Sequence, residues 1–162
     1  MEIENWTIGR MFSFLTKQYV GHLTKSMSHS PIERYFYPLY IIGKKSGEMS
    51  QQQLADCLLL DKVSMVRILD VLTADGFIER KVNPNDRRQH LLHITNAGKP
   101  WVEEINEKLV EADAFFLHFI PKEEQEVFRK NLVLLCNNTE NCYKNTIEIE
   151  QLSIKNTPFR KH

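Results

Sequence analysis

The strongest constraint on the fold is a pair of short helices that the sequence predicts near the middle of the chain. Ser50 occupies an N-cap position and Gln53 completes the capping-box pattern, which predicts a first helix ending near Cys57. Asp61 can cap a second helix, and Gly76 marks the end of that helix. Two helices separated by so few residues are typical of a helix-turn-helix.

The second helix, predicted to run from Lys62 to about Asp75, has two contrasting faces. Apolar residues at helical spacing form one buried stripe: Met65, Ile68, Leu69 and Leu72. The opposite face carries Val63, Val66, Arg67 and Asp70, with Ser64 at its edge. A solvated face seldom carries two valines, but in a DNA major groove their methyl groups can meet thymine methyls, and Arg67 can reach guanine or a phosphate. The alternative is that these valines pack against another part of the protein.

A charged hairpin is predicted directly after this helix. The segments FIERKV (77–82) and QHLLHIT (89–95) favour β-strands and flank an Asn-Pro-Asn-Asp turn. Arg87 and Arg88 then lie at the loop tip, where their repulsion is relieved by an anionic partner such as a narrow minor groove. Asp86 is expected to hold Arg88 through a charge-assisted hydrogen bond. A solvated charged turn is the alternative.

The remainder of the chain is predicted to be mostly helical. Pro38 lies inside the helix predicted over about residues 32–45. It can bend this helix or delay its start. Thr95 is placed to cap the helix predicted over about residues 96–119. Pro100 lies near the first turn of that helix, where a missing amide costs least. No structure is assigned to the tail after Lys144. The predicted helices cover approximately residues 5–25, 32–45, 96–119 and 121–144.

Charge is unevenly distributed in a chain whose formal net charge is zero, a balance that argues against a generally polybasic binder. Residues 61–99 carry seven Lys/Arg and five Asp/Glu, whereas residues 103–126 carry two Lys and eight Asp/Glu. No apolar run approaches the roughly 18 residues that a membrane span requires. The acidic start lacks the basic residues and apolar core of a secretion signal. A cytoplasmic protein with no membrane partner is therefore expected.

The segment LADCLLLDKVSMVRILDVLTADGFIERKVNPNDRRQHLLHITNAGK closely resembles the winged helix-turn-helix core of MarR-family transcription regulators. The family pattern is Asp-Lys-x-x-x-x-Arg-x-x-Asp-x-Leu, then Gly-aromatic/aliphatic-Ile-x-Arg, a wing with Asp-x-Arg, and Leu-Thr-x-x-Gly-Lys. The matching residues are Asp61, Lys62, Arg67, Asp70, Leu72, Gly76, Ile78, Arg80, Asp86, Arg88, Thr95, Gly98 and Lys99. The helix layout is similar over about residues 5–145.

The resemblance implies a mainly α fold, with a winged helix-turn-helix DNA-binding core, a two-stranded β wing and N- and C-terminal dimerisation helices. It also implies an obligate homodimer that places two recognition helices on a pseudo-palindromic operator in double-stranded DNA, often with a ligand pocket between the dimerisation and DNA-binding parts. The expected divisions are an N-terminal dimerisation helix in 1–30, the DNA-binding domain in 31–99, C-terminal dimerisation helices in 100–145 and a tail in 146–162.

Some residues depart from the family pattern on the second helix of the pair. Val63 and Val66 stand where relatives usually have Ser or Thr, and Val71 stands where Arg is common. These changes remove polar contacts from the helix and suggest narrower or weaker DNA affinity, while the wing is intact. The residues predicted to contact or organise DNA are Lys62, Val63, Ser64, Val66, Arg67, Arg80, Asp86, Arg87 and Arg88.

Enzymatic and metal-dependent functions are weaker interpretations of this sequence. No nucleophile-and-base motif or phosphate-binding loop is present, so no catalytic residue and no cofactor are assigned. His90 and His93 have odd spacing on a strand and should face opposite sides, which prevents joint chelation. His22, His29 and His118 are scattered, so no metal ligand is assigned.

The cysteines leave a thiol-responsive regulator open as an alternative. Redox-sensing relatives usually rely on a cysteine in the first helix, and this chain has none there. Cys57 is expected to pack in the core, and Cys136 and Cys142 do not share a helix face.

The sequence thus predicts a homodimeric, sequence-specific DNA-binding regulator. The expected mode is repression by occlusion of a promoter. A small-molecule effector relieves it by shifting the dimer to a half-site spacing that no longer fits the operator. A thiol- or metal-responsive regulator of the same fold is one alternative, and a winged-helix protein-interaction module with weakened DNA binding is another. Five aromatic residues could line an effector pocket, although such stripes are more often core or dimer interface: Trp6, Phe12, Tyr35, Phe36 and Tyr37.

Overall fold

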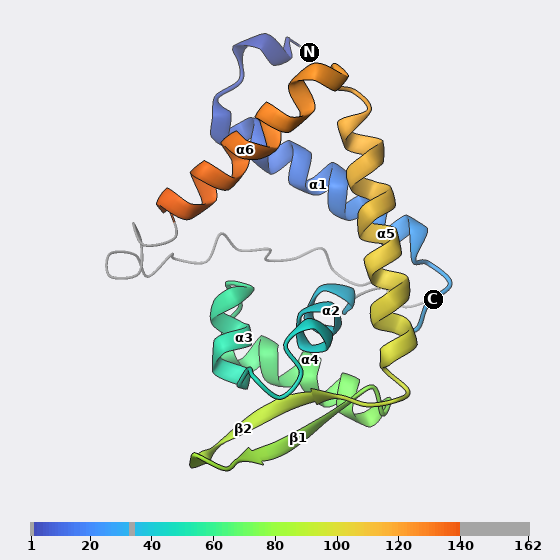
Figure 1. The fold of residues 1–162 in the computed structure, drawn as a ribbon, viewed down its shortest axis with the longest axis vertical. Coiled ribbons are helices and arrows are strands. Elements are labelled where there is room, and N and C mark those ends of the chain that lie inside the picture. Colours follow the sequence, from blue (N-terminus) through green and yellow to red (C-terminus); the bar gives the residue numbers. More distant parts are fainter. Residues whose placement is uncertain (1, 33–34, 140–162) are drawn as a thin grey trace. The chain divides into compact units, whose positions relative to one another are not determined.

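The computed structural model describes residues 2–32 and 35–139, which divide into two compact units between Phe116 and Leu117. The fold is mainly helical with one two-stranded antiparallel sheet, as expected from the sequence (Figure 1). The first unit begins with the 3-10 helix η1 (Ile3–Asn5) and continues with α1 (Ile8–Ser26), α2 (Phe36–Lys44), α3 (Gln51–Cys57), α4 (Lys62–Ala74), β1 (Ile78–Asn83), β2 (Asp86–Ile94) and α5 (Lys99–Leu117). Helix α6 (Lys122–Thr139) belongs to the second unit.

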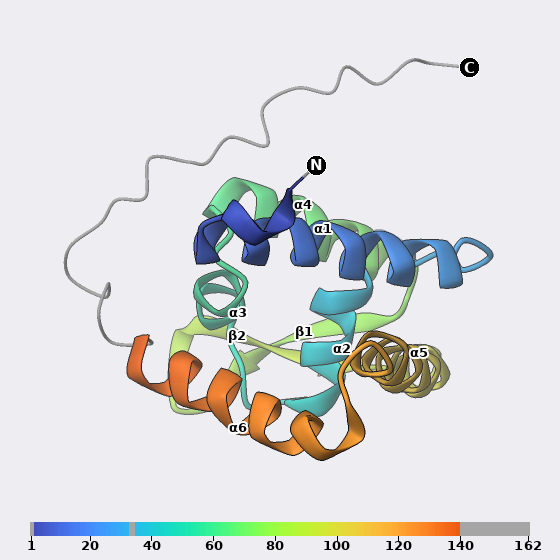
Figure 2. The same ribbon diagram turned by 90° about the horizontal axis from the view of Figure 1, so that it is seen from above.

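Helix α2 occupies the centre of the first unit, between α3 and α5 in both ribbon views (Figure 1, Figure 2). It begins at Phe36 rather than at Ile32, and Pro38 lies in its first turn. A first-turn proline sacrifices no helical hydrogen bond, so Pro38 delays the start of the helix and does not break it. Close packing against α5 requires Gly43, because a Cβ atom there would overlap the side chain of Val102.

Both helices of the central pair begin at the caps that the sequence predicted. The Gln53 amide N–H donates to Ser50 Oγ at 3.3 Å, and the Ser50 amide N–H donates to Gln53 Oε1 at 2.8 Å, which completes the capping box. Asp61 caps α4 through the Ser64 amide at 2.9 Å. Gly76, at φ +75°, follows the end of α4. These caps satisfy amides that a helix leaves without intrahelical partners.

Helix α3 ends in a turn with an unusual residue. The Leu60 amide donates to Ala55 O at 2.9 Å and the Leu59 amide donates to Asp56 O at 3.3 Å, which is the Schellman arrangement. Leu59 adopts φ +52°, the left-handed conformation that glycine usually supplies at this position. Its side chain is 83% exposed, so burial does not offset the strain.

Cys57 is exposed, so the prediction that it packs in the core was wrong. Helix α3 buries Leu54 and Ala55 and half-buries Leu58. The centre of that buried face lies roughly 100° around the helix from Cys57, given about 100° per residue. The three-residue spacing between the buried Leu54 and Cys57 was therefore not enough to predict burial of the Cys57 thiol.

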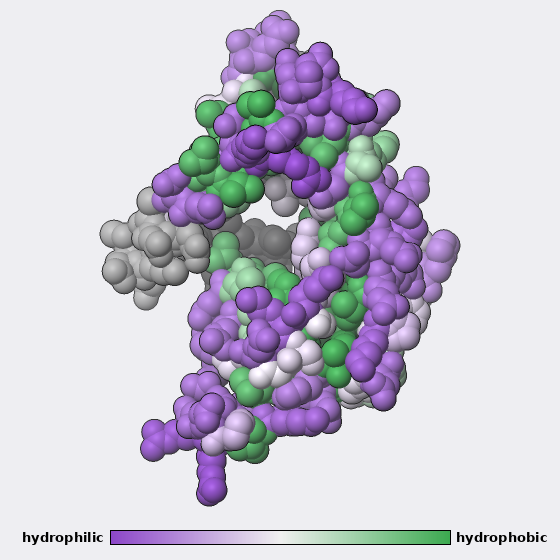
Figure 3. Space-filling view, viewed as in Figure 1, coloured by the Kyte–Doolittle hydropathy of each residue, from purple (hydrophilic) through white to green (hydrophobic). Residues whose placement is uncertain are grey.

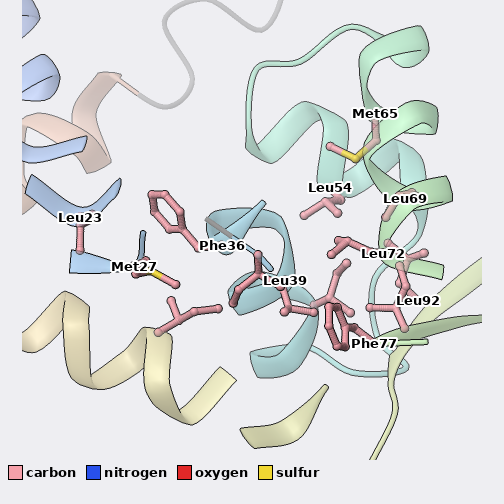
Figure 4. Close-up of a cluster of buried hydrophobic side chains, with 14 of the residues drawn as sticks. Leu23, Met27, Phe36, Leu39, Leu54, Met65, Leu69, Leu72, Phe77 and Leu92 are labelled. Carbon is pink, nitrogen blue, oxygen red and sulfur yellow. The ribbon is translucent and has the colours of Figure 1, made fainter. Parts of the chain in front are cut away.

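The core of the first unit is one apolar cluster, to which helices α1, α2, α3, α4 and α5 and the hairpin all contribute. In Figure 4, Leu54 of α3 lies beside Met65 and Leu69 of α4, with Leu72 and Leu92 next to them. The predicted stripe on α4 is confirmed, with Ile68 half-buried and its other three members fully buried. The fully buried large side chains are Leu23, Met27, Ile32, Leu39, Ile42, Leu54, Met65, Leu69, Leu72, Ile78, Leu92 and Ile105. Burial of the stripe fixes which face of α4 remains outside.

Helix α5 begins at Lys99 rather than at Asn96, because residues 96–98 form a turn. Thr95 Oγ1 accepts the Gly98 amide at 3.1 Å, so Thr95 organises this turn and the helix follows it. Gly98 lies against the Phe77 carbonyl, where a Cβ atom would clash. Helix α6 starts directly after Pro121, and its predicted end at Lys144 lies outside the described residues.

Candidate nucleic-acid interface

The N-terminus of α4 is organised by one carboxylate. Asp61 accepts the Ser64 amide at 2.9 Å through Oδ1 and the Ser64 hydroxyl at 2.6 Å through Oδ2. The Ser64 side-chain hydrogen bond, followed by the backbone bond, lowers the pKa of Asp61 below its usual value. Because the Ser64 hydroxyl has one proton, this pairing leaves Ser64 as a hydrogen-bond acceptor only.

The outward face of α4 combines apolar and cationic side chains. Val63 is 61% exposed, Val66 is half-buried, and Lys62 and Arg67 are exposed. Within the described part of the chain, neither the Lys62 side chain nor the Arg67 side chain forms a hydrogen bond or an ion pair. The structure therefore brings all five residues that were predicted on this helix, Ser64 included, to its outer side or edge.

Arg80 joins the hairpin to α4. Its Nη2 atom lies 2.7 Å from Asp70 Oδ1, across ten residues of sequence. Its Nε atom is buried without a hydrogen-bond partner in the described structure. The sequence placed both residues on the DNA side and did not pair them, because their contact depends on how α4 packs on β1. In this position Arg80 orients the hairpin relative to α4, and any contact with DNA must share its guanidinium with Asp70.

The hairpin β1–β2, here called the wing, is fixed at its base and irregular near its tip. At the base, the Leu92 amide donates to Met49 O at 2.9 Å and the Gly47 amide donates to Leu92 O at 2.8 Å, so the segment before α3 holds the outer edge of β2. Toward the tip the register jumps from Val82↔His90 to Asn83↔Asp86. Residues 87–89 consequently have no partner on β1 and form a bulge, a feature that redirects side chains.

The two arginines lie in this bulge and not at the turn itself. The turn consists of Pro84 and Asn85, and β2 already includes Arg87 and Arg88, so the prediction that they form the loop tip was wrong. The turn is shorter than predicted because Asn83 Oδ1 accepts the Asn85 amide at 2.9 Å and closes it locally. Both arginines are exposed, and the wing tip is hydrophilic in Figure 3.

Asp86 acts on the backbone of Arg88. Its Oδ1 accepts the Arg88 amide N–H at 3.0 Å, an amide that the bulge leaves without a strand partner. The predicted hydrogen bond, in which the Arg88 guanidinium donates to Asp86, is not the one that the structure forms. Asp86 therefore stabilises the shape of the bulge and leaves the charge of Arg88 available to an anion.

Other predicted candidates are dispersed. No group of three or more His, Cys, Asp or Glu side chains within the described residues could hold a metal ion. His93 packs against Gly47, whereas His90 is exposed, as expected for residues on opposite sides of a strand. Cys136 is exposed, and Cys142 lies outside the described residues.

The five aromatic residues considered for an effector pocket have different environments. Trp6 lies edge-on to Phe14 at 5.3 Å and Phe12 is 44% exposed, while Phe36 is buried in the core beside Tyr37. Burial, reinforced by Asp113, raises the pKa of Tyr37. Tyr35 and Tyr37 pack against the core cluster that includes Phe36, whereas Trp6 and Phe12 are not part of that cluster.

No helix in the described part of the chain is long and apolar enough to cross a membrane.

A helix pair with a capped, outward-facing second helix and an adjoining two-stranded wing defines a winged helix-turn-helix protein. Residues 34–89 match the model of the MarR family. Over this segment the chain is similar to the MarR family, and its winged helix-turn-helix fold is the fold of the regulators in that family.

Solved structures share this fold over most of the chain. The crystal structure of MarR is 22% identical with a TM-score of 0.78, over 88% of this chain and 96% of that one. A MarR transcriptional regulator from Methanosarcina mazei Go1 is 20% identical with a TM-score of 0.76, over 83% and 97%. A Listeria monocytogenes protein assigned to the MarR family, in complex with a 26mer DNA, is 21% identical with a TM-score of 0.74, over 83% and 89%.

Proposed function

We propose that this protein is a homodimeric, sequence-specific regulator that binds a pseudo-palindromic operator in double-stranded DNA and represses transcription until a small-molecule effector releases it. The observation that carries the proposal is the outward face of α4, where the exposed Val63 and Arg67 lie opposite the buried stripe of Met65, Leu69 and Leu72. A helix with this exposure, next to a cationic wing, fits the docking geometry of winged helix-turn-helix proteins in a major groove.

The wing supplies the second contact in this proposal. Arg88 enters the minor groove beside the recognition helix α4, and Arg87 contacts phosphates. Both side chains are exposed in a bulge that Asp86 stabilises. A narrow A·T-rich minor groove has enhanced negative potential, so it attracts an inserted arginine more strongly than a G·C-rich groove does. The DNA complex of the Listeria relative, which shares the fold, supports DNA as the ligand class.

In this proposal the terminal helices form a homodimer, and the dimer presents one recognition helix to each half-site. Ile8, Phe12 and Leu15 of α1 are 70%, 44% and 46% exposed and recur at the spacing of one helix face. In α6, Val133, Leu134 and Leu135 are each at least 50% exposed. Apolar surface on this scale marks an interface, and we assign it to a second copy of the chain. The dimerisation parts are residues 1–30 and 100–145, flanking a DNA-binding domain in 31–99, and the protein acts in the cytoplasm.

In vitro selection from a random pool of duplexes tests DNA binding and yields the recognition sequence. We expect a motif with two related half-sites about one helical turn apart. The affinity for the selected duplex should fall steeply with salt, with a slope that reports the number of neutralised phosphates. Failure to enrich any sequence, with no salt-dependent binding to the pool, would contradict the proposal.

A protein-interaction module is the second candidate, because Val63 exposes apolar surface where polar side chains are usual in the family. An apolar protein contact depends only weakly on salt, so the same titration separates the two functions.

A further inference from the structure

We propose that α4 reads its operator chiefly through the C5-methyl groups of pyrimidines, with Val63 as the specificity-determining residue. This inference rests on the proposed DNA-binding function and deepens it by naming the chemical group that the helix recognises. Thymine presents this methyl group in the major groove, and 5-methylcytosine presents the same group beside an amino donor.

Most polar groups of α4 are already engaged within the protein. The Ser64 hydroxyl donates its proton to Asp61, and the Thr73 hydroxyl donates to Leu69 O at 2.6 Å. The Asp70 carboxylate accepts from Arg80 at 2.7 Å. A major-groove code that relies on hydrogen bonds requires donors and acceptors that are free to meet base edges. Neither hydroxyl can donate to a base without giving up a bond that it now makes.

Lys62 and Arg67 are the cationic side chains that α4 retains for DNA, and they account for phosphate contact or for one guanine. The remaining exposed chemistry in the N-terminal half of the helix is apolar. Val63, at 61% exposure, lies one turn before Arg67, and Val66 lies half-buried beside both. The N-terminal residues of a recognition helix are the ones that approach base edges.

Contact between a valine methyl and a pyrimidine methyl removes apolar surface from water on both sides. The gain from one buried methyl corresponds to about fourfold in affinity. A hydroxyl group in the place of the valine methyl would gain nothing from contact with the pyrimidine methyl and would lose its own hydration. The helix therefore favours thymine at the position that faces Val63 and discriminates weakly between the other bases.

The test uses the duplex recovered by in vitro selection, with each thymine replaced in turn by deoxyuridine. Deoxyuridine removes only the C5-methyl group and keeps the base pair and O4. We expect about a fourfold loss of affinity at one or two symmetry-related thymines in each half-site and no loss elsewhere. In the same positions, a 5-methylcytosine·guanine pair should bind more tightly than a cytosine·guanine pair.

Two variants assign the effect to Val63. Val63→Ala should bind the thymine duplex more weakly and should no longer distinguish thymine from deoxyuridine at that position. Val71→Ala, which truncates an exposed valine two turns further along α4, should retain the full deoxyuridine effect. The melting temperature of each variant shows whether the fold is intact. If Val63→Ala does not fold, Val63→Thr, whose side chain has nearly the same shape, is the second variant at this position.

The outcomes separate this inference from the function on which it rests. Tight, salt-dependent binding with no deoxyuridine effect at any thymine overturns methyl readout and leaves the DNA-binding function standing. A deoxyuridine effect that persists in Val63→Ala overturns the assignment to Val63. Absence of binding to any selected duplex overturns the proposed function, and the inference falls with it.

Discussion

Leu59 is a single residue whose strain can be measured. It holds φ +52° at the C-terminal turn of α3, where an L side chain costs about 1–2 kcal/mol, and its 83% exposure recovers little of that cost. We expect Leu59→Gly to raise the free energy of unfolding by up to about 1 kcal/mol, since glycine gains freedom in the unfolded chain as well. Thermal or urea denaturation measures the change.

The neighbouring residue is a matched control for this prediction. Leu60 has no positive φ, so Leu60→Gly should destabilise the protein by increasing the entropy of the unfolded chain. If both substitutions destabilise equally, Leu59 is held by contacts whose value exceeds the backbone strain.

Arg67 and Arg80 provide a second comparison between single residues. Arg67 has no partner among the described residues, so Arg67→Ala should weaken operator binding by about 1–3 kcal/mol and leave the melting temperature nearly unchanged. Arg80→Ala leaves Asp70 without its ion-pair partner and loosens the wing on α4, so it should reduce both binding and stability. Fluorescence anisotropy and thermal denaturation measure the two effects. A large loss of stability in Arg67→Ala would show that Arg67 is structural.

At the level of secondary-structure elements, the shape of the wing depends on Asp86. Asp86→Ala removes the acceptor of the Arg88 amide, so the bulge loses order and operator binding should weaken by about tenfold, close to the lower limit expected for one lost hydrogen bond to a charged group. Simple electrostatics predicts the opposite sign, because the substitution removes a negative charge near DNA. Asp86→Asn keeps an acceptor oxygen and should bind at least as tightly as the parent protein. Tighter binding by Asp86→Ala at every salt concentration would reject this role.

The cap of α4 makes the stability of that element depend on pH. The pKa of Asp61 is lower in the folded protein than in the unfolded chain, because Ser64 donates two hydrogen bonds to the carboxylate. Its contribution is therefore fully present above the unfolded pKa of about 4 and is lost as the pH falls through the folded pKa. We expect Asp61→Ala to lower the melting temperature by a few degrees at pH 7 and by less at pH 3.

Asp61→Asn separates the charge from the cap in this experiment. Asparagine is as good an N-cap residue and does not titrate in acid, so this variant should keep the stability at pH 7 but show a flatter acid limb. An equal loss in Asp61→Ala at both pH values would mean that the carboxylate charge does not contribute.

For the whole molecule, the exposed apolar faces of α1 and α6 predict an obligate dimer. We expect a dimer of about 38 kDa in sedimentation at low micromolar concentration, twice the 19.1 kDa chain, with more than about 2,000 Å² of total buried surface. Leu15→Arg places a charge on the apolar face of α1 and should dissociate the dimer. Lys17→Ala, at an exposed polar position of the same helix, should leave it intact. A stable folded monomer of the parent chain would reject this assembly.

The sequence by itself determined the features that depend on neighbours within a few residues. The capping box at Ser50, the carboxylate cap at Asp61 and the stop at Gly76 each involve bonds or dihedral angles inside one turn of chain. The buried stripe of α4 followed from helical spacing alone, and with it came the outward face that forms the candidate site.

Only the tertiary structure decided the features that depend on packing between elements. The Arg80–Asp70 pair joins residues ten positions apart on different elements, and the bulge at Arg87 and Arg88 depends on the register between two strands. Cys57 was misplaced because the face that α3 buries is set by its packing against neighbouring elements. Local patterns fix a helix and its faces, since the relevant bonds lie within the element. Register, pairing and burial across elements depend on the free energy of the assembled core, which no short stretch of sequence contains.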